Sequence, residues 1–341
     1  MLGVELAEAR LQLVDRYVDG AEKVSGVELV AGTHVEDSDC AIPPNSHVQP
    51  LRPRICDLMQ SFMLANEPLI RLGFFAGILL SMAVWEYIAP RRRQALSRLR
   101  RWPHNLGIVV LNTVAVRLAF PTAAVALAAI SAEEGWGVLN MLVVPWWASL
   151  VIAVVALDLV IYFQHVLFHA APVLWRLHRM HHADLEFDVT TGLRFHPLEI
   201  VLSMAIKLAA VIALGPPAVA VLIFEVVLNG SSMFNHGNVR IAARLDRTLR
   251  WFVVTPDMHR VHHSIRPDET NSNFGFNLPW WDRLFGTYRV QPAAGHLDMT
   301  IGIEQFRRPR DQWLDRMLIQ PLLGTASGYP INRGSGGPEE E

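Results

Sequence analysis

The sequence predicts an all-α protein, a multi-pass transmembrane helical bundle. Its 341 residues are 51% hydrophobic and only 18% charged, whereas an ordinary soluble domain carries about 25% charged residues. The mean hydropathy is +0.25, and several apolar stretches approach the roughly 20 residues that a helix needs to cross a bilayer. The net charge of -2 and the two cysteines exclude a protein that coats nucleic acid, a disulfide scaffold and a four-thiolate zinc site.

Five apolar stretches are each expected to form a membrane-spanning helix. They cover residues 69–89, 106–130, 138–168, 198–214 and 218–234. Gly215-Pro216-Pro217 separates the last two stretches, which are therefore predicted to form a helical hairpin, because proline cannot continue a helix. Lys207 and Glu225 lie at similar depth on the two arms of this hairpin. Either they form a buried pair or Lys207 extends its amine toward water.

The predicted membrane domain covers residues 67–323, and the segments on either side have a different composition. Residues 1–66 carry scattered acids, both cysteines and no signal-peptide pattern. They are expected to be a soluble or disordered tail, or an overlong start with translation beginning at Met59 or Met63. Residues 324–341 are rich in glycine, proline and serine and are expected to be disordered. Residues 312–323 are predicted to form a short amphipathic helix.

Basic residues predict the orientation of the spans. Six arginines lie between the first two stretches, at positions 91, 92, 93, 98, 100 and 101. The loop after the second stretch carries Glu133 and Glu134 and no basic residue. By the positive-inside rule the arginine loop is cytoplasmic. All the histidine-rich segments then lie on the cytoplasmic side, either of a bacterial inner membrane or, in a eukaryote, of the endoplasmic reticulum.

The histidines recur at helical spacing. His165 and His169 lie four residues apart at the end of the third stretch, and two segments share the pattern H-x-x-H-H. Their histidines are His178, His181 and His182, then His259, His262 and His263. Positions i, i+3 and i+4 share one face of a helix, so each segment can direct its imidazoles at one point. Eight imidazoles are enough for two metal ions with three to five ligands each.

The ligand type narrows the choice of metal. Imidazole suits zinc, copper, iron and nickel and disfavours magnesium and calcium. A structural zinc closes with four ligands, fewer than the histidines offer, so two iron ions that activate O2 fit better. Spacing alone does not separate iron from zinc. The complete fold prediction is therefore a transmembrane helical bundle with a cytoplasmic, histidine-rich di-metal cap.

Three further polar residues are candidates for the same site. Asp158 lies on one helical stripe with His165 and His169, and is expected to accept a hydrogen bond from a ligand histidine outside the metal's own coordination shell. A plain packing contact is the alternative for Asp158. His196 and His236 lie at the two ends of the predicted hairpin. We favour His236 as a ninth ligand, and His196 is either a ligand or a residue that supports one.

Residues 240–254 alternate arginine with apolar side chains. This pattern predicts a basic amphipathic helix that lies in the plane of the lipid headgroups. A solvated charged face is the alternative.

The histidine motifs, taken in order, resemble the fatty acid hydroxylase / sterol desaturase superfamily of integral-membrane di-iron oxygenases. The resemblance covers roughly residues 70–290 and rests on the following motifs: His165-x-x-x-His169, His178-x-x-His181-His182, His196-Pro197-Leu198-Glu199, Asn235-His236, Asp257-Met258-His259-Arg260-Val261-His262-His263, Asn273-Phe274-Gly275 and Trp281-Asp282-Arg283-Leu284-Phe285-Gly286-Thr287. It implies that the eight histidines of the boxes, with His236 as an addition, hold two iron ions.

The resemblance also implies an activity. The substrate would be a membrane lipid such as a sterol, a fatty acyl or an alkyl lipid, oxidised by O2 and two electrons, with hydroxylation favoured over desaturation. No His-Pro-Gly-Gly haem motif accompanies His34 or His47, so a separate electron donor is expected: a ferredoxin, a cytochrome b5-like protein or a reduced pterin.

Two other functions stay open. A non-enzymatic protein that binds or transports metal would need ligands near the membrane midplane, whereas these histidines gather at one face. A lipid-binding pseudoenzyme is less consistent with a complete set of box histidines.

Overall fold

The computed structural model describes residues 55–120, 122–325 and 328–331. Within these ranges the chain forms helices and no strand, as the composition predicts, apart from two isolated bridges. The expectations for residues 1–54 and 332–341 lie outside the described residues. The expected disorder of the C-terminal segment is wrong for residues 328–331, where the Tyr329 side chain is buried and the Ile331 amide donates to the His169 carbonyl oxygen. Residues 55–65 of the predicted N-terminal tail form a helix.

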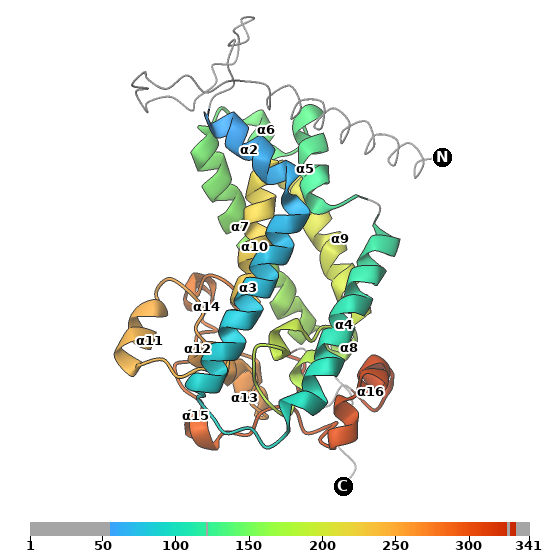
Figure 1. Ribbon diagram of the computed structural model, residues 1–341, viewed down its shortest axis with the longest axis vertical. Coiled ribbons are helices and arrows are strands. Elements are labelled where there is room, and N and C mark those ends of the chain that lie inside the picture. Colours follow the sequence, from blue (N-terminus) through green and yellow to red (C-terminus); the bar gives the residue numbers. More distant parts are fainter. Residues whose placement is uncertain (1–54, 121, 326–327, 332–341) are drawn as a thin grey trace, which may run out of the picture. The chain divides into compact units, whose positions relative to one another are not determined.

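The helices follow in the order shown in Figure 1. The long ones are α3 (Glu67–Ile88), α4 (Arg98–Ala119), α7 (Trp146–Ala170), α9 (Pro197–Leu214) and α10 (Ala218–Asn235). The shorter ones are α2 (Ile55–Ala65), α5 (Ala124–Glu133), α6 (Val138–Met141), α8 (Pro172–His182), α11 (Ala243–Leu249), α12 (Pro256–His262), α13 (Pro267–Thr270), α14 (Trp280–Leu284), α15 (Gly295–Asp298) and α16 (Leu314–Ile319).

Among the described residues, five helical segments are long and apolar enough to cross a membrane, as predicted: Glu67–Ile88, Arg98–Met141, Trp146–Ala170, Pro197–Leu214 and Ala218–Asn235. Two boundaries differ from the prediction. The second apolar stretch is divided between α4 and α5, with Pro121 in the sequence between them. In the third apolar stretch, the long helix α7 begins only after Pro145. Both breaks follow from proline, which lacks the amide hydrogen that a continuing helix requires.

The chain divides into two compact units, and each is described by itself. Unit 1 takes its described residues from 55–73, 120–157 and 207–225, and unit 2 takes them from 74–119, 158–206 and 226–331. In unit 1, Leu139, Ala153 and Ala220 form a small buried apolar cluster. The hairpin turn passes so close to the loop before α6 that a Cβ atom on Gly215 would lie 2.3 Å from the Trp136 carbonyl oxygen. Glycine is therefore required at this position.

Unit 1 also contains the predicted pair of opposite charges. The Lys207 amine lies 2.6 Å from one carboxylate oxygen of Glu225, and the Arg71 guanidinium lies 2.5 Å from the other. Arg71 also pairs with Glu67 at 2.8 Å. Four formal charges thus cancel within one network.

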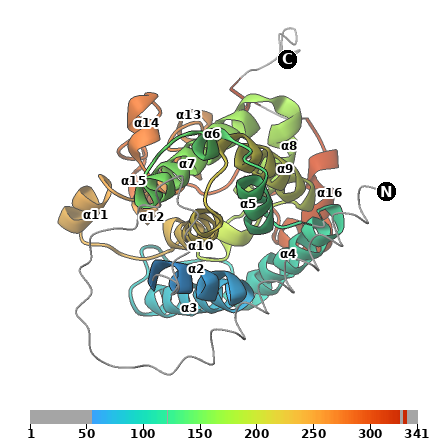
Figure 2. The ribbon, with the colours of Figure 1, turned by 90° about the horizontal axis from the view of Figure 1, so that it is seen from above.

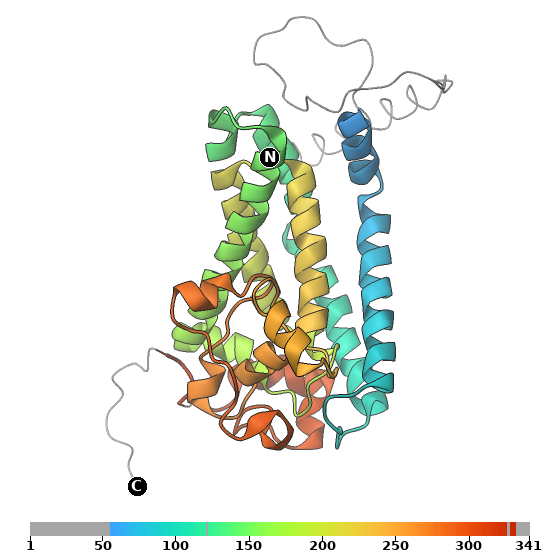
Figure 3. The same ribbon diagram turned by 90° about the vertical axis from the view of Figure 1, so that its left-hand side faces the viewer.

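Unit 2 holds α4 against α16, as Figure 2 shows from above, with Ile108, Met180 and Met317 packed between them. The short helices α12, α13 and α15 gather in the same unit, coloured orange in Figure 3. A buried ionic network joins α4 to the segment after α8. Arg101 donates to the carboxylates of Asp184 and Asp188 at 2.6 and 2.7 Å. This network fixes the segment that follows the second histidine box.

Candidate metal centre

The predicted histidines lie on helices α7, α8 and α12 and just after the end of α10. His165 and His169 lie one turn apart near the end of α7, and the second box occupies the last turns of α8. The third box lies on α12 and its C-cap residue, His263. This helix begins at Pro256, and the hydroxyl of the N-cap residue Thr255 accepts a hydrogen bond from the Met258 amide. His236 directly follows α10. The prediction that each H-x-x-H-H box directs its imidazoles at one point is wrong, because the histidines of both boxes divide between two groups.

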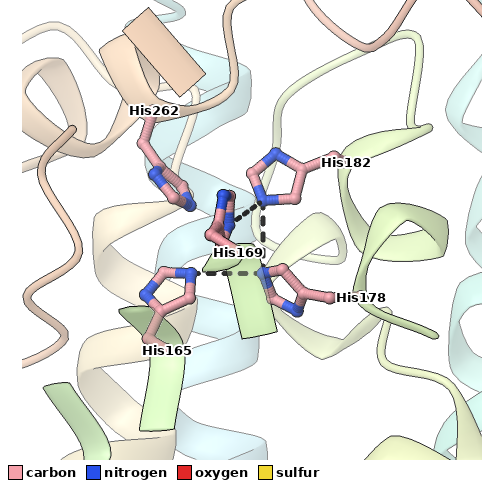
Figure 4. A group of neighbouring side chains, drawn as sticks. All are labelled: His165, His169, His178, His182 and His262. Carbon is pink, nitrogen blue, oxygen red and sulfur yellow. Dashed lines mark hydrogen bonds between the residues drawn. The ribbon is translucent and has the colours of Figure 1, made fainter. Parts of the chain in front are cut away.

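The nine histidines gather into two buried groups. The five-histidine group holds His165, His169, His178, His182 and His262, and Figure 4 shows their rings pointing toward one another. The four-histidine group holds His181, His236, His259 and His263. Within each group the nearest ligand atoms all lie within 4.8 Å of one another. The two groups are neighbours, since the rings of His182 and His263 stack with their centroids 4.6 Å apart.

Hydrogen bonds fix which ring nitrogen faces the centre of the five-histidine group. His165 Nδ1 donates to the Phe274 carbonyl oxygen at 2.7 Å, and His262 Nδ1 donates to that of Ser272 at 2.8 Å. His178 Nδ1 donates to the Glu199 carboxylate at 2.6 Å. A neutral imidazole carries one proton, so the Nε2 atoms of these rings carry lone pairs. Yet the Nε2 atoms of His165 and His178 lie 3.1 Å apart.

The four-histidine group repeats this arrangement around His236. Its Nδ1 donates to the Ser232 carbonyl oxygen at 2.7 Å, so its Nε2 has a single lone pair and no proton. Three other Nε2 atoms, those of His181, His259 and His263, each lie 3.1 Å from it. One lone pair can accept one hydrogen bond, not three. A cation between the nitrogens removes this conflict in both groups.

The donor set fits a transition-metal ion. Two nitrogens that each lie about 2.1 Å from a common ion at roughly a right angle are about 3.0 Å apart, close to the 3.1 Å observed here. Imidazole donors suit iron, zinc and copper. Carbonyl and carboxylate acceptors on the outer nitrogens are also typical of metal-binding histidines, because they fix the tautomer and the orientation of the ring.

Burial keeps the clustered histidines neutral. Loss of water contact lowers the pKa of His181, His182, His259, His262 and His263 well below 6.5, and neighbouring imidazoles lower it further. Burial also lowers the pKa of His236 to about 3. Neutral imidazole is the form that binds metal, so protons compete weakly with metal at these positions.

Two predicted site residues lie elsewhere. His196 belongs to neither group: its Nε2 donates to the Leu318 carbonyl oxygen at 3.1 Å, and its Nδ1 accepts from the Leu198 amide at the start of α9. Asp158 accepts from the Asn277 side chain, the Leu278 amide and the Trp281 indole, and among the described residues none of its hydrogen bonds comes from a histidine. The expected Asp158–histidine bond is therefore replaced by an anchor between α7 and the segment 277–281.

The supporting carboxylate is instead Glu199, which sequence reasoning noted only as a neighbour of His196. Asn271 was also missed: its side-chain oxygen accepts from His169 Nδ1 at 3.1 Å, while its nitrogen donates to the Tyr329 carbonyl oxygen. The one available signal was the position of Glu199 in the His-Pro-Leu-Glu motif, three residues after His196.

Aromatic side chains enclose both groups. The Phe274 ring lies 5.1 Å from that of His169, and Trp175 lies 4.8 Å from it on another side. Phe195 stacks on His181 at 4.5 Å in the four-histidine group. These rings exclude water from the centre, which strengthens electrostatic interactions inside it.

Comparisons with known proteins agree with this geometry. Residues 150–287 match the family model described as fatty acid hydroxylase. Ornithine lipid hydroxylase OlsE of Rhizobium tropici is 31% identical over 157 residues, 46% of each chain. Alkylglycerol monooxygenase is 26% identical over 189 residues in Xenopus tropicalis (54% of this chain, 39% of the relative) and 24% over 191 residues in Homo sapiens (54% and 40%).

The match thus spans less than half the length of these curated relatives, and no solved structure matches the chain. All nine clustered histidines lie inside the region that the family model covers. Residues 150–287 therefore resemble the fatty acid hydroxylase family in sequence, and the histidine geometry agrees with that match.

Proposed function

We propose that the chain is a membrane di-iron oxygenase that hydroxylates a C–H bond of a lipid. One observation supports this proposal above all. In two adjacent buried groups, one of five and one of four histidines, unprotonated Nε2 atoms of neighbouring rings face one another. Two neighbouring sites rich in imidazole suit a pair of redox metals better than a single structural zinc, which needs four ligands.

The reaction consumes O2, two electrons and two protons, and converts R–H into R–OH with release of one water. Bound iron supplies the activation of O2. The protein positions the ligands and excludes water. Glu199 holds the proton of His178 on Nδ1, and the carbonyl groups of Phe274, Ser272 and Ser232 do the same for His165, His262 and His236. Phe274 and Trp175 keep solvent away from His169.

Among lipid substrates, we favour the acyl or alkyl chain of a polar lipid over a sterol. The relatives are named for ornithine lipid and alkylglycerol, and both names denote lipids with a polar head. Both relatives are also named for oxygen insertion, which favours hydroxylation over desaturation here. The five apolar helices are the membrane contact that such a substrate requires.

We further propose that the histidine groups lie on the cytoplasmic side and receive electrons from a separate donor. The arginine-rich segment 91–101 supports this orientation by the positive-inside rule. The donor is a ferredoxin, a cytochrome b5-like protein or a reduced pterin. Each is supplied in turn to membranes that contain the chain, and the donor that supports formation of the hydroxylated lipid identifies the class.

The activity is tested by expressing the chain in a host and supplying isotope-labelled O2. Lipid extracts should then contain a product one oxygen heavier than its parent, with the label in that oxygen. The His181→Ala variant should lose the product, because His181 belongs to the four-histidine group. His104→Ala is the matched control, since His104 stacks on Trp313 at 5.4 Å and belongs to neither group. An unlabelled product, or a product that persists in His181→Ala, contradicts the proposal.

A further inference from the structure

Exposed apolar side chains gather on two short segments of unit 2. One is α11 with the turn that follows it, and the other is α14 with Phe285; both appear on the left of Figure 1. Six side chains there are between 45% and 69% exposed: Leu245, Trp251, Phe252, Trp280, Leu284 and Phe285. Apolar residues of this size and density on an exposed surface indicate an interaction site.

The two segments are joined into one surface. The Trp280 indole donates to the Trp251 carbonyl oxygen at 2.7 Å. The Arg283 guanidinium lies 4.2 Å from the centre of the Trp251 ring and donates to the Arg250 carbonyl oxygen at 3.1 Å. We call residues 240–253 and 280–285 the interface platform. The predicted single helix over residues 240–254 is thus only seven residues long, and α14 extends its apolar face.

The interface platform adjoins a helix that is expected to cross the membrane. The Phe285 ring lies 5.0 Å from that of Phe163, a 48% exposed residue of α7. Trp281 is anchored to the same helix through Asp158 at 2.8 Å. Phe163 lies seven residues before the end of α7 at Ala170, which is about 10 Å along the helix axis. This position matches the boundary between acyl chains and headgroups, where aromatic side chains are enriched in membrane proteins.

Charge favours lipid over a protein partner. Arg240, Arg244 and Arg247 are exposed on the interface platform, and among the described residues none of the three takes part in an ion pair. The one carboxylate of α11, Asp246, already pairs with Arg250 at 2.7 Å. The interface platform thus combines three arginines outside any ion pair of the described residues with exposed tryptophan and phenylalanine. This composition is typical of a segment that binds an anionic bilayer surface.

We propose that the interface platform binds the anionic phospholipid surface of the bilayer that the long helices cross. Its aromatic side chains enter the boundary below the headgroups, and its three arginines contact lipid phosphates. The platform then brings the bilayer close to the metal centre, because Phe285 stacks on Tyr162, Tyr162 contacts Phe274, and Phe274 contacts His165.

The test places a fluorescent label on the interface platform in the full-length chain. Cys40 and Cys56 are replaced by serine, and Phe252→Cys carries an environment-sensitive probe. The chain is reconstituted in nanodiscs of phosphatidylcholine and phosphatidylglycerol. Quenching by a lipid nitroxide attached near the headgroup is compared with quenching by aqueous iodide. Arg308→Cys is the matched control, because the Arg308 side chain is 85% exposed and lies outside the platform.

We expect the lipid nitroxide to quench the probe at residue 252 more than iodide does, with the reverse for the probe at residue 308. Arg244→Gln combined with Arg247→Gln should reduce lipid quenching at residue 252 in the anionic nanodiscs, by up to about five-fold per charge removed. Nanodiscs of phosphatidylcholine alone should show little difference between the two proteins.

Two outcomes overturn the proposal. Iodide quenching at residue 252 equal to that at residue 308 means that the interface platform faces water. Protection from both quenchers means that a protein, either a partner or a second copy of the chain, covers it. The measurement needs neither metal nor turnover, so its result is independent of the proposed oxygenase activity.

Discussion

At the clustered histidines, the outer nitrogen of each ring determines what the inner nitrogen can do. Backbone carbonyl groups fix His165, His262 and His236, and a substitution cannot remove those acceptors. His178 differs, because its acceptor is the side chain of Glu199 at 2.6 Å. A carboxylate acceptor also raises the basicity of the ring as a ligand. Glu199 is therefore a positioning residue that mutation can test, as is Asn271, whose side-chain oxygen accepts from His169 Nδ1 at 3.1 Å.

We predict that Glu199→Ala weakens iron binding about 10-fold to 100-fold, the usual effect of losing such an outer partner. Glu199→Gln retains an acceptor oxygen and should lose less. Iron content after competition with a graded series of chelators measures the difference. Glu304→Ala, at an exposed carboxylate, is the control, and equal retention of iron in Glu304→Ala and Glu199→Ala would show that Glu199 does not support the site.

The lowered pKa values of the buried histidines predict how the metal-free protein responds to pH. The unfolded chain takes up protons near pH 6.5, whereas His181, His182, His259, His262 and His263 stay neutral in the folded state. Their contribution to stability is therefore complete above pH 6.5 and is lost as the pH falls. Asp282 and Glu186 act in the opposite direction because burial raises the pKa of each carboxyl, that of Asp282 to about 6, but they are fewer than the five histidines.

Thermal unfolding of the metal-free protein in detergent measures this dependence. We expect Tm to fall as the pH decreases below 6.5, and the fall to be shallower in a variant that combines His181→Gln with His263→Gln. A Tm that stays constant or rises over this interval would mean that these imidazoles are not held neutral by the fold.

Sequence spacing predicted the histidine boxes, but only positions i and i+4 of each H-x-x-H-H box meet through local helix geometry. The i+3 histidine of each box, His181 or His262, belongs to the other group. Spacing did not predict the outer partners of the histidines. Asp158 shares a stripe of α7 with His165, yet its carboxylate accepts from Asn277 and Trp281. Glu199 reaches His178 only because α9 approaches α8 in the tertiary structure. No local pattern encodes that approach, so the role of Glu199 could not be read from the sequence.

At the scale of helices, apolar length predicted all five candidate spans, while prolines moved two of their boundaries. The charged residues within the spans are the informative exceptions. Glu225 lies between Lys207 at 2.6 Å and Arg71 at 2.5 Å. Hydropathy placed Lys207 and Glu225 at similar depth, but Arg71 lies on a third helix that only the fold brings to them.

We predict that Glu225→Gln destabilises the protein more than Lys207→Met does. The first variant leaves buried Lys207 and half-buried Arg71 without their shared anion, and breaking a buried pair typically costs about 3–5 kcal/mol. The second leaves Glu225 paired with Arg71, which also retains Glu67. The temperature at which each variant loses its monodisperse peak in size-exclusion chromatography reports the order. The reverse order would contradict the network.

For the molecule as a whole, the histidine centre depends on residues beyond the family match at 150–287. The Tyr329 ring stacks on Trp175 with centroids 5.5 Å apart. The Ile331 amide donates to the His169 carbonyl oxygen at 3.0 Å, and Arg179 donates to the Gln320 carbonyl oxygen. Gln320, Tyr329 and Ile331 therefore fasten the outside of the five-histidine group. The glycine- and serine-rich composition near residue 324 gave no indication of this role.

The proposed activity requires that the two histidine groups hold a pair of iron ions. The most direct test is elemental analysis with Mössbauer spectroscopy of the full-length chain purified in detergent. We expect two irons per chain, one for each histidine group, magnetically coupled in the native protein. The His181→Ala variant should lose the coupling and part of the iron, while His104→Ala retains both. Zinc alone after growth in iron-rich medium, or iron that His181→Ala retains in full, would contradict the di-iron account.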